Sequence, residues 1–226
     1  MRMLDLFCGR FGWGKTFAAR GWEVVGIDLV APPSIPDGCT FLNADILKIG
    51  YLPYEGFVLT DSDMVSIGEF DFICASSPCE QFSVHGMRHF HPNPPYPELG
   101  IKLFNHTRAL CETASVPYVM ENVRLAQKFV GNAINHSGPF YLWGNAVPPI
   151  LPQGISKGIK VGTGQATHGM TSEQKKEYRK LHAWSQAGSK SKARREMTAI
   201  AATIPLELAN AVADYAERIL EQARTA

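Results

Sequence analysis

Two predicted strands in this sequence end in residues that can carry chemistry. The segment SSPCEQFS places Cys79 directly after Pro78, where an apolar run gives way to polar residues. A second apolar run, VPYVMENV, ends in Glu121 and Asn122. A buried cysteine is usually a small apolar filler, but ligands of open α/β sheets bind at the carboxyl ends of the strands. Cys79 is therefore a candidate for chemistry, with a buried structural thiol as the alternative.

A glycine-rich segment near the N-terminus, DLFCGRFGWG, is a candidate ligand-binding turn. Glycines between a first strand and a helix let the backbone approach a nucleotide-like ligand. Asp28 closes the second predicted strand, where an acid can accept both hydroxyls of a ribose. Asp45 closes the third, where it could receive an adenine amino group. The alternatives are plain packing for the glycines and capping or surface roles for the two acids.

The elements that position these residues alternate along the chain. Strands are predicted over residues 1–7, 22–29, 39–47, 70–78 and 116–123, and helices over residues 9–21 and 100–114. Strands separated by helical patterns require crossover connections and a parallel sheet. The sequence therefore predicts a doubly wound α/β fold. Further predictions are a long loop over residues 85–100, a helix within 171–186, and a helix start at residue 197 followed by a longer helix after Pro205.

The composition is that of a soluble globular protein. Of the 226 residues, 45% are hydrophobic and 19% are charged. No stretch reaches the roughly 18 apolar residues of a membrane span, and MRMLDLFCG lacks the pattern of a signal peptide. We therefore expect a cytoplasmic protein with one domain and no membrane partner. It would comprise a catalytic core of about residues 1–145, a basic region of about 146–196 and a C-terminal helical part of about 197–226.

Cysteine and charge usage narrow the interpretation further. The five cysteines contain no C-x-x-C pair, so neither a disulfide framework nor a zinc site is favoured. Cys8, Cys39, Cys74 and Cys111 are interpreted as structural. Residues 151–195 contain ten Lys/Arg and two acids, whereas the whole chain has a net charge of only +1. A basic segment on an acidic body indicates a surface that faces a polyanion, with a solvated charged stretch as the alternative.

These pieces together resemble the DNA cytosine-5 methyltransferase family. The resemblance covers residues 3–123 and rests on the order DLFCGRFG, Asp28, Asp45, Pro78-Cys79 and Glu121-Asn122-Val123. The short chain and the segment MTAIAATIP are most similar to small phage-borne members. The resemblance implies a Rossmann-like methyltransferase fold with a reduced recognition region, S-adenosylmethionine as cofactor and DNA as partner. It also implies a bacterial host cytoplasm if the gene is phage-borne, and we favour a monomer.

The resemblance also implies a role for each matching residue. Cys79 would attack carbon 6 of a flipped-out cytosine, Glu121 would contact ring nitrogen 3, and Pro78 and Asn122 would shape the site. The residues implied to bind the cofactor are Asp5, Phe7, Gly9, Gly12, Asp28, Asp45 and Ser77. The residues predicted to bind nucleic acid are Arg88, Arg124, Lys175, Lys176, Arg179 and Lys180.

The sequence departs from the family pattern at three places. Phe11 stands where the cofactor loop of the family has its middle glycine, so we expect an adjusted loop geometry. Glu80 follows the Pro-Cys pair in place of the usual glutamine. The segment HSGPFYLWGNAVPP lacks the arginine of the family's Gln-x-Arg-x-Arg strand, which Arg124 or Arg88 could replace.

Three histidines in the long loop, His85, His89 and His91, match no compact zinc pattern, so no metal is predicted. Two alternatives to DNA cytosine methylation stay open. The same fold and nucleophile could act on RNA, on a free pyrimidine nucleotide or with another one-carbon donor. A nucleic-acid-binding relative without turnover is the second alternative, motivated by Glu80 and Phe11.

Overall fold

The architecture comes from a computed structural model, which describes residues 1–60, 65–89, 91–155, 171–173, 176 and 203–225. Its centre is a seven-stranded sheet with the order β3-β2-β1-β7-β8-β10-β9. The parallel strands are β1 (Arg2–Leu6), β2 (Glu23–Asp28), β3 (Cys39–Asn43), β7 (Phe72–Ser76) and β8 (Tyr118–Asn122). These five strands lie within the five predicted ranges, and the doubly wound α/β class is confirmed.

The strand order reverses between β1 and β7, because the chain winds from β1 through β2 to β3 and returns to the other side of β1. A reversal of this kind opens a crevice at the carboxyl ends of the two central strands. The Gly-rich turn follows β1, and the Pro78-Cys79 segment follows β7. The topology therefore brings the two candidate regions to the same edge of the sheet.

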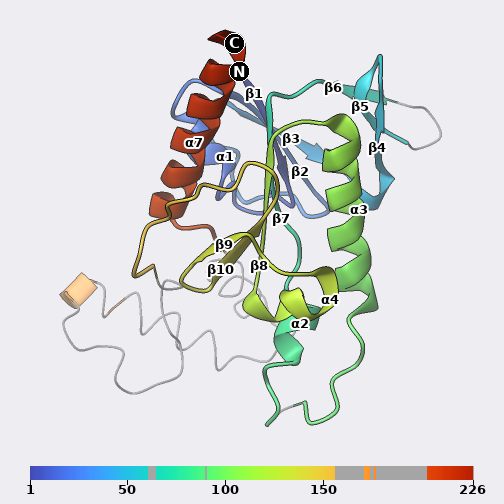
Figure 1. Cartoon of the computed structure of the whole chain (residues 1–226), viewed down its shortest axis with the longest axis vertical. Helices are drawn as coiled ribbons and strands as arrows, with labels where there is room; N and C mark the ends of the chain where they lie inside the picture. The colour runs from blue at the N-terminus through green and yellow to red at the C-terminus, as the bar shows by residue number, and fades with distance from the viewer. Residues whose placement is uncertain (61–64, 90, 156–170, 174–175, 177–202, 226) are drawn as a thin grey trace.

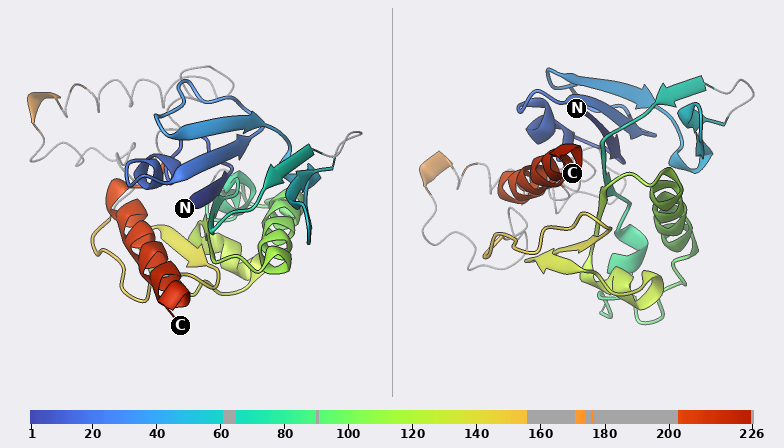
Figure 2. Two further views of the ribbon diagram at one scale, coloured as in Figure 1. Left: turned by 90° about the horizontal axis from the view of Figure 1, so that it is seen from above. Right: turned by 45° about the horizontal axis from the view of Figure 1, so that its top comes forward.

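Helices cover both faces of this sheet (Figures 1 and 2). One face carries α1 (Gly14–Ala18) and α7 (Leu206–Thr225), which begins directly after Pro205 as predicted. The opposite face carries α3 (Glu98–Ala114). Two apolar cores result, one around Phe17 and Leu208 and the other around Phe104. The strands β1, β2, β7 and β8 are buried on both faces, which explains their nearly continuous apolar runs.

Several elements have no counterpart in the prediction from sequence. A separate antiparallel sheet consists of β4 (Ile49–Leu52), β5 (Gly56–Leu59) and β6 (Val65–Gly68). Two short strands, β9 (Asn135–Ser137) and β10 (Phe140–Trp143), extend the central sheet beyond β8, with β10 antiparallel to it. The remaining short helices are η1 (Ile46–Lys48), α2 (Glu80–Val84), η2 (Arg124–Ala126) and α4 (Gln127–Val130).

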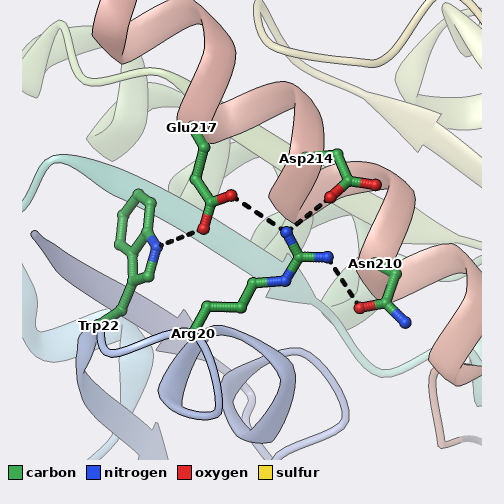
Figure 3. Close-up of polar contacts among 5 residues, drawn as sticks. All are labelled: Arg20, Trp22, Asn210, Asp214 and Glu217. Carbon is green, nitrogen blue, oxygen red and sulfur yellow. Dashed lines mark hydrogen bonds and ion pairs between the residues drawn. The ribbon is translucent and has the colours of Figure 1, made fainter.

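The C-terminal helix is fastened to the N-terminal part of the chain by a polar cluster (Figure 3). Arg20 donates to Asp214 at 2.6 Å, to Glu217 at 3.1 Å and to Asn210 at 2.9 Å. The indole of Trp22 donates to the other oxygen of Glu217 at 3.1 Å. The three acceptors lie at helical spacing, so they share one side of α7.

Three sequence predictions fall mostly on parts of the chain that the structure does not describe. They are the basic region 146–196, the helix within residues 171–186 and the helix start at residue 197. Within the described residues, no helix is both long enough and apolar enough to cross a membrane.

Candidate active site

A cavity of about 250 Å³ opens at the carboxyl ends of the parallel strands. It runs from the ends of β2 and β3 to the ends of β7 and β8. Its lining residues are Phe7, Asp28, Leu29, Asp45, Ile46, Ser76, Ser77, Pro78, Cys79, Glu80, Leu103, Glu121 and Phe140. One cavity therefore joins the region predicted to hold a cofactor, which we call the cofactor half, to the region with the candidate nucleophile, which we call the reacting half.

Cys79 lies in the turn between β7 and α2 and is half-buried in the cavity wall. Its carbonyl accepts the amide of Ser83 at 2.9 Å, which starts α2. The other cysteines lie outside the lining. Burial raises the pKa of Cys8, Cys74 and Cys111, and it raises the pKa of Cys39 to about 11. Because only a thiolate is nucleophilic, these four are poor nucleophiles at neutral pH.

Glu121 and Asn122 end β8, the strand next to β7. Glu121 is 8% exposed and lines the cavity, while Asn122 is fully buried. The amide nitrogen of Asn122 donates to both the carbonyl and the hydroxyl of Ser77, each at 3.0 Å. Its amide oxygen accepts from the backbone of Val123 at 2.8 Å. Asn122 therefore ties the turn before Cys79 to the strand that carries Glu121.

The glycine-rich turn keeps a left-handed backbone where the sequence departs from the family pattern. Phe11 has φ +55°, and Gly9 has φ +50°. The Phe11 ring is fully buried against Gly26 of β2, where an added Cβ would lie 2.3 Å from the ring. Phe11 therefore fills the space under the turn and does not enter the cavity. The backbone at Phe11 has the left-handed conformation that favours glycine, even though the residue there is not glycine. The loop accommodates Phe11 because Gly26 has no side chain and leaves room for the ring.

The two predicted acids of the cofactor half both line the cavity and are half-buried. The Asp28 carboxylate accepts the amide of Gly9 at 3.0 Å and the amide of Val30 at 3.1 Å. Asp45 accepts the amide of Leu47 at 3.0 Å and caps η1. A carboxylate offers about four acceptor sites, so each retains capacity for a ligand. The observed hydrogen bonds of both acids are structural, and their role in binding stays a prediction.

Three residues implied to bind the cofactor, Asp5, Gly9 and Gly12, lie outside the lining. Asp5 is buried beneath the turn, where it accepts the amide of Gly14 at 2.9 Å. Burial raises the pKa of Asp5 to about 7, and the nearby charge of Asp28 adds to this effect. Gly12 packs against Ile204, whose backbone nitrogen lies 2.9 Å from the position of an added Cβ. Asp5 therefore supports the turn from below, and Gly12 lets Ile204 approach the turn closely; their place in the motif revealed neither contact.

The charge of the lining is one-sided. Four carboxylates face the cavity, Asp28 and Asp45 in the cofactor half and Glu80 and Glu121 in the reacting half, and none of the lining residues is Lys, Arg or His. A cavity of this kind favours a ligand with positive charge over one that brings a phosphate inside. Glu80 is exposed, so its carboxylate lies at the mouth.

Sequence reasoning did not identify every lining residue. Phe140 begins β10 and forms part of the wall, within the segment that lacks the arginine implied by the resemblance. The register places Leu142 opposite Glu121, so β10 is the direct neighbour of the acid-bearing strand. Leu103 of α3 also reaches the cavity. No local signal marks either residue, because both arrive through tertiary packing.

The predicted nucleic-acid contacts lie away from the lining or outside the described residues. Arg88, Arg124 and Lys176 are exposed. Lys175, Arg179 and Lys180 belong to the parts that the structure does not describe. Among the described residues, no group of three or more His, Cys, Asp or Glu side chains could hold a metal ion.

Comparisons with known proteins identify no family. No family model and no curated protein matches the chain. The solved structures it resembles include a protein assigned as a DNA modification methyltransferase encoded within an E. coli prophage, at 17% identity and a TM-score of 0.39. That alignment covers 56% of this chain and 33% of the other, so this chain matches about a third of its length. The glycopeptide N-methyltransferase MtfA, complexed with S-adenosylmethionine, matches at 16% identity and a TM-score of 0.28, over 53% of this chain and 46% of that one. Likenesses of this degree assign no function.

Proposed function

We propose that this protein is an S-adenosylmethionine-dependent methyltransferase that acts on carbon 5 of cytosine in DNA through a covalent adduct with Cys79. The observation that carries the proposal is the single cavity with Cys79 and Glu121 in its reacting half and Asp28 and Asp45 in its cofactor half. These are the residues on which the resemblance to the cytosine-5 family rests. They lie at the carboxyl ends of four strands, which the topology of the sheet brings to one edge.

The donor set of the cofactor half fits S-adenosylmethionine. A bound donor would supply an electrophilic methyl group on a positively charged sulfur. The lining contains four carboxylates and no cationic side chain, which suits that charge. Asp28 would accept the ribose hydroxyls, and Asp45 would accept the adenine amino group. Phe7 lies in the same wall, at φ +58°, and would pack against the ligand.

The residues of the reacting half would divide the chemistry between them. The Cys79 thiolate would form a bond to carbon 6, which moves an electron pair of the 5,6 double bond to carbon 5. Glu121 would hold a proton at ring nitrogen 3 and so stabilise the charge that builds there. Carbon 5 would then take the methyl group, whose bond to the donor sulfur breaks and leaves that sulfur neutral. Carbon 5 would next lose its hydrogen as a proton to water, and the bond from carbon 6 to the Cys79 sulfur would break to restore both the double bond and the thiolate. Burial of Glu121 excludes water from that proton.

Trapping of the adduct tests this proposal. The protein is mixed with duplex DNA containing 5-fluorocytosine and with S-adenosylmethionine, and a denaturation-resistant protein–DNA species is measured. Fluorine at carbon 5 cannot leave as a proton, so a working enzyme stays bound through its thiol. We expect the adduct with the parent protein and none with Cys79→Ala. Cys39→Ala is the matched control, since Cys39 is also half-buried but lies outside the lining.

A protein that binds S-adenosylmethionine but gives no adduct would contradict the choice of DNA cytosine as substrate. One observation favours a second candidate in that case, the same nucleophile acting on RNA. Phe140 and Glu121 line the same cavity, and the residues of β10 include no arginine, so this strand lacks the contact to the base that the resemblance implies. A free nucleotide fits less well, because its phosphate would face a lining of carboxylates.

A further inference from the structure

A hydrogen bond between an indole and a hydroxyl joins the two halves of the cavity. The indole nitrogen of Trp13 donates to the hydroxyl of Ser76 at 2.9 Å. Trp13 belongs to the glycine-rich turn and is 1% exposed. Ser76 is the last residue of β7, lines the cavity and lies three positions before Cys79. The bond therefore runs from the turn of the cofactor half to the segment that carries the nucleophile.

The position of Trp13 is itself tightly determined. The indole is packed in the core on the α1 and α7 side of the sheet. The backbone carbonyl of Trp13 accepts a hydrogen bond from the amide of Thr16 at 3.0 Å. The next residue, Gly14, donates its backbone amide to the buried carboxyl of Asp5. A buried aromatic ring that is also held by its backbone has little freedom to follow a shift of its acceptor. The turn can therefore act as a fixed support for Ser76.

The opposite side of the same segment is held by a different strand. Ser77, the neighbour of Ser76, accepts two hydrogen bonds from the buried amide of Asn122 on β8. Two consecutive serines thus receive hydrogen bonds from two different directions, directly before the Pro78-Cys79 pair. The cofactor turn fixes one side of the segment, and the strand with Glu121 fixes the other.

We infer that Trp13 and Ser76 are positioning residues, which set the distance between the donor methyl group and the nucleotide base that Cys79 holds. The inference rests on the proposed function. Methyl transfer requires reacting atoms about 3–3.5 Å apart, and a misplacement of about 1 Å can cost about 100-fold in rate. The attack of the thiol needs no such alignment with the cofactor turn. Loss of the Trp13–Ser76 bond should therefore slow methyl transfer more than it slows the attack.

Two measurements on the full-length protein separate these steps. Attack of the thiol alone is followed without cofactor, from loss of tritium out of DNA labelled at carbon 5 of cytosine, since addition at carbon 6 lets carbon 5 exchange its hydrogen with water. Methyl transfer is followed in single turnover with saturating S-adenosylmethionine. For Ser76→Ala and for Trp13→Phe we expect transfer to fall about 10- to 100-fold, with exchange within about threefold of the parent.

The double variant and a matched control complete the test. Trp13→Phe with Ser76→Ala should lose no more transfer than the worse single variant, because residues that act through one shared bond are not additive. Ser66→Ala is the control, since Ser66 also makes a side-chain hydrogen bond, to Glu55 at 2.9 Å, but lies in β6 away from the cavity. It should leave both rates unchanged.

Each outcome has a distinct meaning. An equal fall of exchange and transfer in Ser76→Ala, or no fall in either, overturns the positioning role while the parent remains active. Additive losses of methyl transfer in the double variant would show that Trp13 and Ser76 do not act through one shared bond. A parent protein without exchange and without transfer overturns the proposed function, and the positioning role with it.

Discussion

The two halves of the cavity are built by different kinds of interaction. The turn of the cofactor half rests on buried groups beneath it, the aromatic ring of Phe11 and the carboxyl of Asp5. The reacting half rests on a neutral network in which Asn122 uses both its amide nitrogen and its amide oxygen. Among the residues that the structure describes, none donates a hydrogen bond to the second oxygen of Asp5.

Because of this difference, changes in core volume and in pH should affect the two halves differently. A turn supported by packing and by one titratable carboxyl depends on core volume and on pH. A network of amides and hydroxyls depends on neither, because its members do not ionise in the physiological range. The cofactor half should therefore respond to changes in stability, and the reacting half to changes in geometry alone.

The largest effect should come from breaking the chemistry of the reacting half without disturbing its support. Glu121→Gln keeps the shape of the side chain but removes the acid that holds the proton, so we expect methyl transfer to fall about 10²- to 10⁴-fold. The affinity for S-adenosylmethionine, measured by calorimetry, should change little. A parallel loss of cofactor affinity would place Glu121 in the cofactor half instead.

Removal of the ring under the cofactor turn should have the largest effect on folding. Phe11→Ala leaves a cavity in the core, and we expect the free energy of unfolding in urea to fall by about 3–5 kcal/mol. Phe7→Ala is the matched control, since Phe7 also has a positive φ but is only half-buried at the cavity wall. Equal losses in the two variants would show that burial of the Phe11 ring does not decide the stability of the turn.

The buried carboxyl of Asp5 should make stability depend on pH. Its pKa is raised to about 7 in the folded protein, chiefly by burial, whereas an unfolded Asp titrates near pH 4. The folded state therefore binds more protons between these values, so stability falls as pH rises from about 4 to about 7. Asp5→Asn should reduce this slope by up to about 1.4 kcal/mol per pH unit.

Asn122→Ala is the control for this pH dependence of stability, because it weakens the reacting half without removing a titratable group. Its unfolding curves, measured across the same pH range, should keep the slope of the parent. If Asp5→Asn also keeps that slope, the raised pKa of Asp5 is wrong.

The smallest effect concerns α7, the helix that packs against α1. Arg20→Ala removes the three hydrogen bonds to α7 shown in Figure 3, and we expect a loss of about 1 kcal/mol, because the pair with Asp214 is largely exposed. Arg218→Ala, an exposed arginine on the same helix that lies over Tyr215, should cost less than about 0.5 kcal/mol. A loss for Arg20→Ala no greater than for Arg218→Ala would show that apolar burial alone holds α7.

The strands of the central sheet were predictable because their signal is local. Buried parallel strands appear as short, nearly continuous apolar runs, and β1, β2, β7 and β8 all have this form. The small sheet was not predictable by this means. Its strands have four residues each, contain glycines, and are partly exposed, so neither a continuous apolar run nor a clear alternation marks them.

The sequence by itself determined where the candidate nucleophile and the acids stand relative to their strands, because a strand end is set by neighbouring residues. Only the tertiary structure decided that these ends share one cavity, that Asp5 supports the turn from below, that Gly12 lies against Ile204, and that Phe140 forms part of the wall. It also decided the contacts between distant residues. Trp13 and Ser76 are 63 positions apart, and Arg20 and Asp214 are 194 apart. Contacts at such separations depend on how the whole chain packs, and no short stretch of sequence encodes them.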